Sequence, residues 1–186
     1  MRRLILQTSL SIDGYVAALD RSHPWSEAGE GDERVKRWIL DSVSAAGAHL
    51  MGRVTYEEMA SAWPTSDSAF ARPMNEIPKV VFSRTLERAD WRETRIARGD
   101  LQDEIEKLKR EPGDDLIAYG GARLDQALTR LGLVDEYRLM IQPAALGDGL
   151  ALFKDLPAPL HLDLIDARTY NGGLAIHVYR PKGPVP

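Results

Sequence analysis

The fold is indicated most clearly by residues 116–124, which read LIAYGGARL. The apolar run at 116–119 predicts a buried strand, and two glycines follow it directly. Apolar residues then recur at the spacing of one helix face from Leu124 to Leu131, and Gly132 is placed to end that helix. A strand, a tight glycine turn and a helix in this order form a β–α unit.

The same order occurs twice more upstream. Residues 48–51 predict a short strand that leads through Gly52 into a helix beginning at Arg53, and Pro64 ends that helix. Residues 79–82 predict another strand, followed at once by Ser-Arg-Thr. Repeated β–α units predict a mostly parallel sheet with helices on both faces.

The last third of the chain has a different pattern. Strands are predicted at 134–141, 160–165 and 174–179, and Asn-Gly-Gly at 171–173 indicates a hairpin between the last two. We therefore expect antiparallel strands at one edge of the sheet, in a single domain spanning residues 1–186. The remaining expected elements are a first strand from Leu4 to Leu10, a long loop at 18–34, a helix from Asp32, a loop at 64–77, a weak strand at 91–97 and a helix from Asp100 to Arg110.

Composition excludes several classes of protein. The chain has 186 residues, a net charge of -4 and no cysteine, so disulfides, thiolate zinc sites and iron–sulfur clusters are ruled out. The four histidines lie far apart and predict no metal site. The acidic balance argues against nucleic-acid and membrane-surface partners, and no apolar run is long enough to cross a bilayer. A small-molecule ligand and a cytoplasmic location are the default expectations.

Residues suited to holding phosphate follow three of the predicted strands. A helix N-terminus offers unpaired N–H groups, glycine allows close approach, and arginine binds phosphate oxygens in pairs. If the strands are parallel, all three turns face one crevice, which suits a dinucleotide with a third phosphate. Taken singly, each turn has an ordinary structural interpretation, and no G-x-G-x-x-G fingerprint is present. The turns comprise Gly52, Arg53 and Thr55; Ser83, Arg84 and Thr85; and Gly120, Gly121, Ala122 and Arg123.

The motifs TSLSIDGYVA, LMGRVTYE, KVVFSRT, LIAYGGARL and LGLVDEYRLMIQPAALGDGLALF, in this order, resemble the dihydrofolate-reductase-like superfamily. The closer resemblance is to its riboflavin-biosynthesis branch, the reductase domain of the bifunctional deaminase-reductase and its stand-alone relatives. It covers nearly the whole chain. It implies a three-layer fold with a central mixed sheet, and NADPH lying across the carboxyl ends of the strands.

The resemblance also implies roles for the three turns. The first would hold the cofactor phosphates, the second the 2′-phosphate and adenosine ribose, and the third the pyrophosphate. Ala17, in the loop after the first strand, matches a backbone contact to the nicotinamide amide. Folate reductases usually have a third glycine where Ala122 stands here. The deaminase half cannot be present without cysteine, so a stand-alone reductase is expected.

The candidates for catalysis are carboxylates. Folate reductases carry an acid on the first helix that assists protonation of the pterin, and only Asp32 or Glu33 lies near that place. Asp32 is also a good helix N-cap. Asp13, within IDGYVA, is a candidate for a substrate contact or for a turn.

Candidates for substrate contact are weaker and each has a structural alternative. Tyr15 could stack on a substrate ring or pack in the core. Trp25, with His23 in the long loop, could close over the substrate or pack locally. Asp148, within LGDGLALF, could touch substrate or shape a turn.

These observations predict an NADPH-dependent reductase acting on a small heterocycle. The resemblance makes 5-amino-6-(5-phosphoribosylamino)uracil the first candidate substrate. Two alternatives stay open: a dihydrofolate reductase, and a non-catalytic nucleotide-binding module. The C-terminal strands could form a homodimer surface or cover the core.

Overall fold

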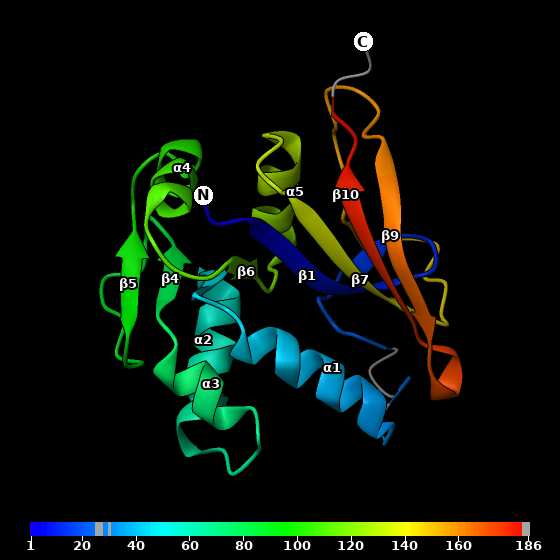
Figure 1. The fold of residues 1–186 in the computed structure, drawn as a ribbon, viewed down its shortest axis with the longest axis horizontal. Helices are drawn as coiled ribbons and strands as arrows, with labels where there is room; N and C mark the ends of the chain where they lie inside the picture. Colours follow the sequence, from blue (N-terminus) through cyan, green and yellow to red (C-terminus); the bar gives the residue numbers. More distant parts are fainter. Residues whose placement is uncertain (25–27, 30, 184–186) are drawn as a thin grey trace.

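The fold was determined as a computed structural model, which describes residues 1–24, 28–29 and 31–183. An eight-stranded sheet crosses the molecule in the order β5-β4-β3-β6-β1-β7-β10-β9 (Figure 1). The expected α/β class, with a mixed and mostly parallel sheet, is confirmed.

Six strands of this sheet run parallel. The first strand, β1 (Leu4–Ser11), lies between β6 (Leu116–Ala118) and β7 (Glu136–Gln142). On the other side of β6 follow β3 (Ala48–Gly52), β4 (Lys79–Phe82) and β5 (Thr94–Ala97). The apolar runs of the central strands are buried on both faces, as expected for parallel strands covered by helices.

The C-terminal strands are antiparallel, as the Asn-Gly-Gly signal predicted. The last strand, β10 (Ala175–Pro181), pairs with β7 and also with the edge strand β9 (Leu162–Thr169). The two are joined by the turn η2 (Asn171–Gly173), in which Gly172 and Gly173 both have positive φ. A separate two-stranded ribbon is made by β2 (Tyr15–Ala17) and β8 (Leu150–Ala151).

Helices cover both faces of the sheet and make three layers (Figure 1). On one face, α4 (Leu101–Arg110) and α5 (Ala122–Arg130) pack on the even-numbered residues of β1, including Leu4 and Leu6. On the other, the cover is α1 (Glu33–Ser44), α2 (Arg53–Ala62) and α3 (Ala71–Glu76), with the 3-10 turn η1 (Trp63–Thr65) after α2. No described helix is long and apolar enough to span a membrane.

Helix α3 corrects the expectation of a loop at 64–77. Pro73 occupies its first turn, where a missing N–H has no intrahelical acceptor to lose. Lys79 is buried on β4, and its Nζ donates to the carbonyls of Met74, Asn75 and Ile77 at 2.8–3.0 Å. A cation at the carboxyl end of a six-residue helix stabilises it from outside its own sequence.

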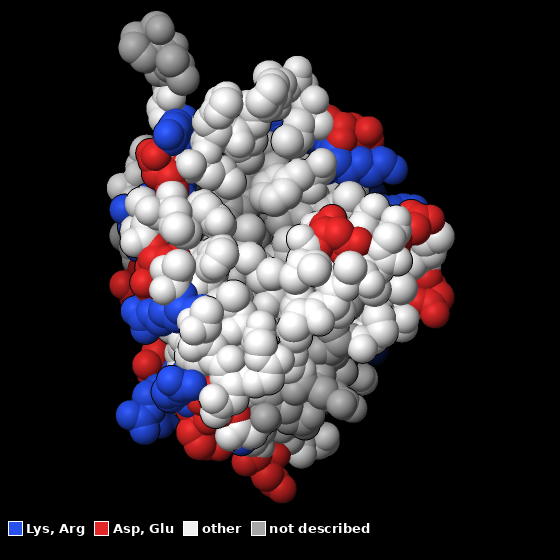
Figure 2. Space-filling model, turned by 90° about the vertical axis from the view of Figure 1, so that its right-hand side faces the viewer, with Lys and Arg blue, Asp and Glu red and all other residues white. Residues whose placement is uncertain are grey.

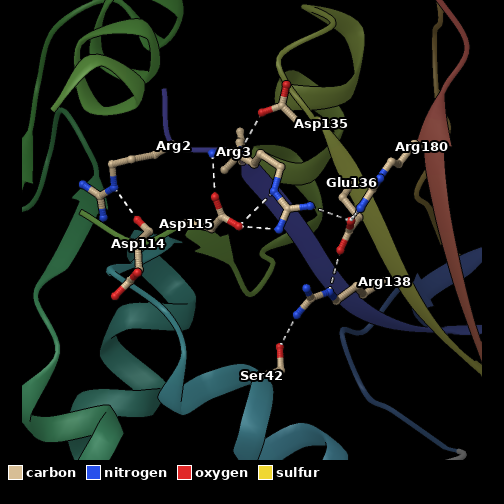
Figure 3. A network of polar contacts seen from close by, with 10 residues as sticks. Arg2, Arg3, Ser42, Asp114, Asp115, Asp135, Glu136, Arg138 and Arg180 are labelled. Atoms are coloured by element: carbon tan, nitrogen blue, oxygen red, sulfur yellow. Dashed lines mark hydrogen bonds and ion pairs between the residues drawn. The ribbon is translucent and has the colours of Figure 1, made fainter. Parts of the chain in front are cut away.

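A buried carboxylate holds three strands and one helix together. Glu136 accepts hydrogen bonds from Arg138 at 2.9 Å, Arg180 at 2.9 Å and Arg3 at 3.1 Å (Figure 3). Arg138 reaches onward to Ser42 on α1, which its Nη1 contacts at 2.7 Å. The side chain of Glu136 is only 4 % exposed, so its charge depends on these partners.

Replacing Glu136 by Gln should therefore be strongly destabilising. Removing one partner of a buried ion pair leaves the others uncompensated and costs roughly 3 kcal/mol or more of unfolding free energy. Urea unfolding monitored by circular dichroism measures the loss. The matched control is Glu76→Gln, which breaks the exposed Arg72–Glu76 pair and should cost under about 0.5 kcal/mol. Equal losses in the two variants would contradict the structural role given to Glu136.

Candidate functional site

The three predicted turns lie at the carboxyl ends of three neighbouring strands. Strands β4, β3 and β6 are adjacent and parallel, with Gly52 opposite Phe82 and Leu50 opposite Ala118. The residues that follow the three strands therefore emerge side by side at their carboxyl ends. Open α/β sheets bind ligands at the carboxyl ends of their strands.

The first and third turns touch each other. Gly120 and Gly121 have φ values of +97° and +95°, which side-chain-bearing residues rarely adopt. Thr55 Oγ1 donates to the carbonyl of Gly120 at 3.3 Å. A Cβ on Gly121 would lie 3.1 Å from Thr55 Oγ1 and 4.0 Å from the nitrogen of Gly52. The glycine pair is thus needed both for the backbone conformation and for this close approach.

Two helices begin at this contact without a side-chain cap. Gly52 is the N-cap of α2 and Gly121 is the N-cap of α5, and neither has a side chain that could accept a hydrogen bond from the first N–H groups of its helix. By contrast, the carboxylates of Asp32 and Asp100 cap α1 and α4. The first N–H groups of α2 and α5 are therefore left for an external anion, with the positive ends of both helix dipoles behind them.

The second turn presents an arginine. Ser83 Oγ accepts hydrogen bonds from the backbone nitrogens of Thr85 and Leu86 at 3.2 and 2.9 Å, which fixes the turn. Arg84 and Thr85 are exposed, and no described carboxylate pairs with Arg84. Its guanidinium is therefore available to a ligand phosphate.

The other two arginines of the predicted site differ. Arg53 forms an i,i+4 ion pair with Glu57 at 2.8 Å, and both side chains are nearly half exposed. Such an exposed ion pair is weak, so Glu57 would compete only modestly with a ligand phosphate for Arg53. Arg123 is exposed in the first turn of α5, next to Ala122.

A pocket of about 410 Å³ lies beside the glycine turn, on the α1–α3 side of the sheet. Tyr119, which lines it, immediately precedes Gly120. Branched apolar side chains of Val16, Ile39 and Val43 line another part. Six aromatic or sulfur-containing side chains form a further part of the wall: Met59, Trp63, Phe70, Met74, Tyr119 and Met140.

Four polar residues complete the described lining of this pocket: Gln7, Thr8, Ser9 and His23. The first three come from β1, where they interrupt an apolar strand. Gln7 was not proposed as a site residue from the sequence. The signal available in the sequence was the polar run of Gln7, Thr8 and Ser9 within an otherwise apolar first strand.

Asp13 lies away from this pocket and joins two loops. Its carboxylate accepts hydrogen bonds from Ser11 Oγ and from the backbone nitrogens of Leu146 and Gly147, the last at 2.7 Å. The hydrogen bond from Ser11, with those from Gly147 and Leu146, holds the pKa of Asp13 below its usual value. These contacts are those of a turn residue, which is one of the two roles that the sequence offered for Asp13.

Asp32 and Glu33 also lie outside the pocket lining. Asp32 caps α1 through the nitrogen of Arg34 and accepts a second bond from the nitrogen of Asn171 at 3.2 Å. The Arg34 side chain, at 2.7 Å, keeps the pKa of Asp32 well below its usual value. Glu33 is 81 % exposed and pairs with Lys36. The acid role that the resemblance implies for Asp32 or Glu33 stays a prediction.

The remaining predicted contacts lie on the small ribbon or its turn. Ala17 is buried on β2 opposite Leu150, and Tyr15 is opposite Ala151. Asp148 is exposed and accepts a hydrogen bond from the nitrogen of Gly149, so it shapes the turn before β8. Trp25 lies outside the described residues. The predicted ligand contacts of all these residues stay predictions.

Comparison with known proteins identifies the family. The sequence profile of the RibD C-terminal domain matches residues 2–176. The chain belongs to the RibD C-terminal domain family. Curated relatives include the uncharacterized protein YyaP of Bacillus subtilis, which is 29% identical over 98% of this chain and 96% of its own length. The uncharacterized protein YwjB of the same organism is 24% identical over 96% of this chain and 98% of its own length.

Solved structures show the same fold at low sequence identity. A Shewanella sp. PV-4 protein whose name assigns it to riboflavin biosynthesis superposes with a TM-score of 0.80 at 22% identity, over 97% of this chain and 99% of its own. A Thermotoga maritima diaminohydroxyphosphoribosylaminopyrimidine deaminase/5-amino-6-(5-phosphoribosylamino)uracil reductase gives 0.70 at 14% identity, over 97% of this chain and 57% of its own. A pyrimidine reductase-like protein of Corynebacterium diphtheriae superposes with a TM-score of 0.63 at 13% identity, over 98% of this chain and 92% of its own. The reductase-type fold of the RibD family is thereby shown.

This RibD-type domain carries one buried carboxyl group that sequence reasoning missed. Asp125, on α5, is fully buried, and neither of its oxygens has a hydrogen-bond partner among the described residues. A Cβ on Gly120 would lie 3.4 Å from Asp125 Oδ2, so the group lies beneath the glycine turn. Burial raises the pKa of Asp125 to about 8.

The pKa of Asp125 predicts a stability that depends on pH. The folded pKa lies above the usual 3.8, so the folded state holds the proton more tightly. Unfolding free energy therefore falls as pH rises from about 4 through 8. Asp125→Asn removes this titration, and its advantage over the wild type should grow by roughly 2–4 kcal/mol between about pH 5 and pH 8.

Urea unfolding at both pH values measures that difference. The control is Asp67→Asn, at an exposed position, whose difference from the wild type should not change with pH. A constant difference between Asp125→Asn and the wild type would show that the burial of Asp125 does not control its protonation.

Proposed function

We propose that this member of the RibD C-terminal domain family is an NADPH-dependent reductase acting on a small heterocyclic compound. One observation carries the proposal. Two uncapped helix N-termini meet where Thr55 contacts the glycine turn, directly beside a pocket of about 410 Å³. An anion site next to an apolar pocket suits a cofactor whose charged diphosphate is held at the turn and whose reactive ring meets a substrate ring in the pocket.

The residues present fit this cofactor. The N–H groups at the starts of α2 and α5 would bind the diphosphate, and the absence of a Cβ at Gly121 leaves room for it. Arg84, exposed and without an ion-pair partner in the described part of the chain, would bind the 2′-phosphate. That contact would give preference for NADPH over NADH.

The chemistry belongs to the cofactor. When bound, NADPH supplies a hydride to a C=N or C=O carbon, a proton adds to the nitrogen or oxygen, and NADP⁺ is formed. The chain's own residues orient the substrate in the pocket. Because Asp13, Asp32 and Glu33 do not line the pocket, we propose that water supplies the proton.

The pocket favours this reductase over the two alternatives. A folate reductase would need a carboxylate in the pocket, and none of the described lining residues has one. A non-catalytic nucleotide-binding module would need no substrate space beside the turn, whereas this pocket is open. The name of the Thermotoga relative makes 5-amino-6-(5-phosphoribosylamino)uracil the first compound to test.

Pairing of two copies through the C-terminal strands stays a prediction. Leu164 and Ile165 on β9 are 54% and 50% exposed. The side of the molecule that carries β9 and β10 is largely uncharged across its centre (Figure 2). Light scattering of the purified protein tests whether a second copy covers this surface.

Calorimetric titration with NADPH and NADH tests the cofactor. We expect NADPH to bind more tightly, and Arg84→Ala to weaken NADPH binding about tenfold while leaving NADH almost unchanged. Arg130→Ala, at the opposite end of α5, is the control and should change neither affinity. Failure of both nucleotides to bind the wild type would refute the reductase proposal.

The glycine turn gives a second test. Gly121→Ala places a methyl group 3.1 Å from Thr55 Oγ1 and forces alanine to a φ of +95°. NADPH affinity should fall at least about tenfold, with a stability loss of roughly 1–3 kcal/mol. Gly132→Ala is the matched control, because its φ is +64° but nothing lies within 4 Å of the added Cβ. It should lose stability and keep its affinity; equal loss of affinity in both would argue against a cofactor site at Gly121.

A further inference from the structure

The pocket beside the glycine turn has a chemical character of its own. None of the described residues that line it is Asp, Glu, Lys or Arg. Trp63 and Phe70 face each other at a tilt, with ring centroids 6.3 Å apart, and three methionines add polarisable surface. Such a wall suits the flat faces of an aromatic ring. A phosphate or carboxylate placed within it would lose hydration without gaining a lysine or arginine partner among these residues.

One polar side chain in the pocket is held in a fixed orientation. Gln7 is 3% exposed, and its Oε1 accepts a hydrogen bond from Ser42 Oγ at 2.6 Å. Ser42 in turn accepts from Arg138 Nη1 at 2.7 Å (Figure 3). Since a guanidinium can only donate, the hydroxyl hydrogen of Ser42 is directed to Gln7.

This relay leaves the amide nitrogen of Gln7 as the group presented to a ligand. Its Oε1 is occupied, while no described residue accepts a hydrogen bond from Nε2. Nε2 is not among the polar atoms sealed in the interior, and Gln7 lines the pocket. A ligand that fills the pocket must therefore accept from Nε2 or leave that donor dehydrated and unpaired.

We propose that this pocket binds an uncharged, flat heterocycle whose ring carbonyl accepts a hydrogen bond from Gln7 Nε2. The inference rests on the proposed reductase function and names the substrate class of the same site. The buried Glu136–Arg138 pair fixes the polarity of the relay through Ser42, so the pocket offers a donor and not an acceptor. A ring of the uracil or pterin type without a phosphate or carboxylate tail has these properties.

Two matched pairs of compounds test the charge preference. The first is 6-methyl-7,8-dihydropterin against 7,8-dihydrofolate, which carries a p-aminobenzoylglutamate tail on the same ring. The second is 5-amino-6-ribosylaminouracil against its 5′-phosphate. Binding is measured by calorimetry with and without NADPH, and turnover by the loss of NADPH absorbance. We expect the uncharged member of each pair to bind about tenfold more tightly or better.

Variants of Gln7 test the hydrogen bond. Gln7→Leu removes the donor and Gln7→Glu replaces it by a charged acceptor. Each should weaken binding of the uncharged probes about tenfold or more, whereas Gln102→Leu, on the exposed face of α4, should not. Melting temperatures show whether the variants fold. If the Gln7 variants do not fold, Ser42→Ala is used in their place, because it releases the orientation of Gln7 and should reduce the same affinities severalfold.

Each outcome bears on one proposal. Tighter binding of the charged members overturns the charge preference, and unchanged affinities in the variants overturn the role of Gln7. If NADPH binds and none of the four probes does, the substrate class is wrong and the reductase function stands. If NADPH itself does not bind, the reductase function fails, and the probe titrations without NADPH still decide what the pocket accepts.

Discussion

The parallel pairing of β4, β3 and β6 is the constraint on which the rest of the site depends. Parallel strands in register end at one level, so three turns far apart in sequence emerge together at a single edge. Two of these turns are short enough to touch only because Gly120 and Gly121 adopt positive φ. The uncapped starts of α2 and α5 follow from the same geometry, since a glycine at the N-cap has no side chain to satisfy the helix N–H groups.

A second constraint acts through charge. Glu136 binds arginines from β7, from β10 and from the residue just before β1, and one of them also contacts α1 (Figure 3). The network therefore joins the parallel part of the sheet to its antiparallel edge and to the helix that borders the pocket. Stability and ligand recognition share the same residues here, because Arg138 both neutralises Glu136 and orients Ser42 toward Gln7.

Local sequence patterns were enough to predict most of the fold. The strands and helices around Gly52, Ser83 and Gly120 have strong local signals: apolar runs, glycine turns and helical spacing. Helix α3 was wrongly predicted as a loop because it is stabilised by the buried Lys79, outside its own sequence. Strands β2 and β8 are too short to show a period of two.

The pocket could not be predicted in the same way. Its described lining comes from seven helices and strands, and three further residues lie between such elements. The importance of Gln7 depends on Ser42, which lies 35 residues away in the sequence. The burial of Asp125 beneath the glycine turn likewise depends on tertiary packing. The sequence gives no sign of it, because an acid in the first turn of a helix is ordinarily a favourable surface residue.

The central position of β1 has a consequence for how the chain is made. Residues 4–11 are synthesised before the other strands of this sheet, yet their two neighbours in the sheet are residues 116–118 and 136–142. The strand that becomes the middle of the core must wait, largely apolar and unpaired, until most of the chain has been synthesised. Long-range pairing of this kind slows folding and exposes nascent chains to aggregation. The order of the strands therefore favours slow folding of this chain.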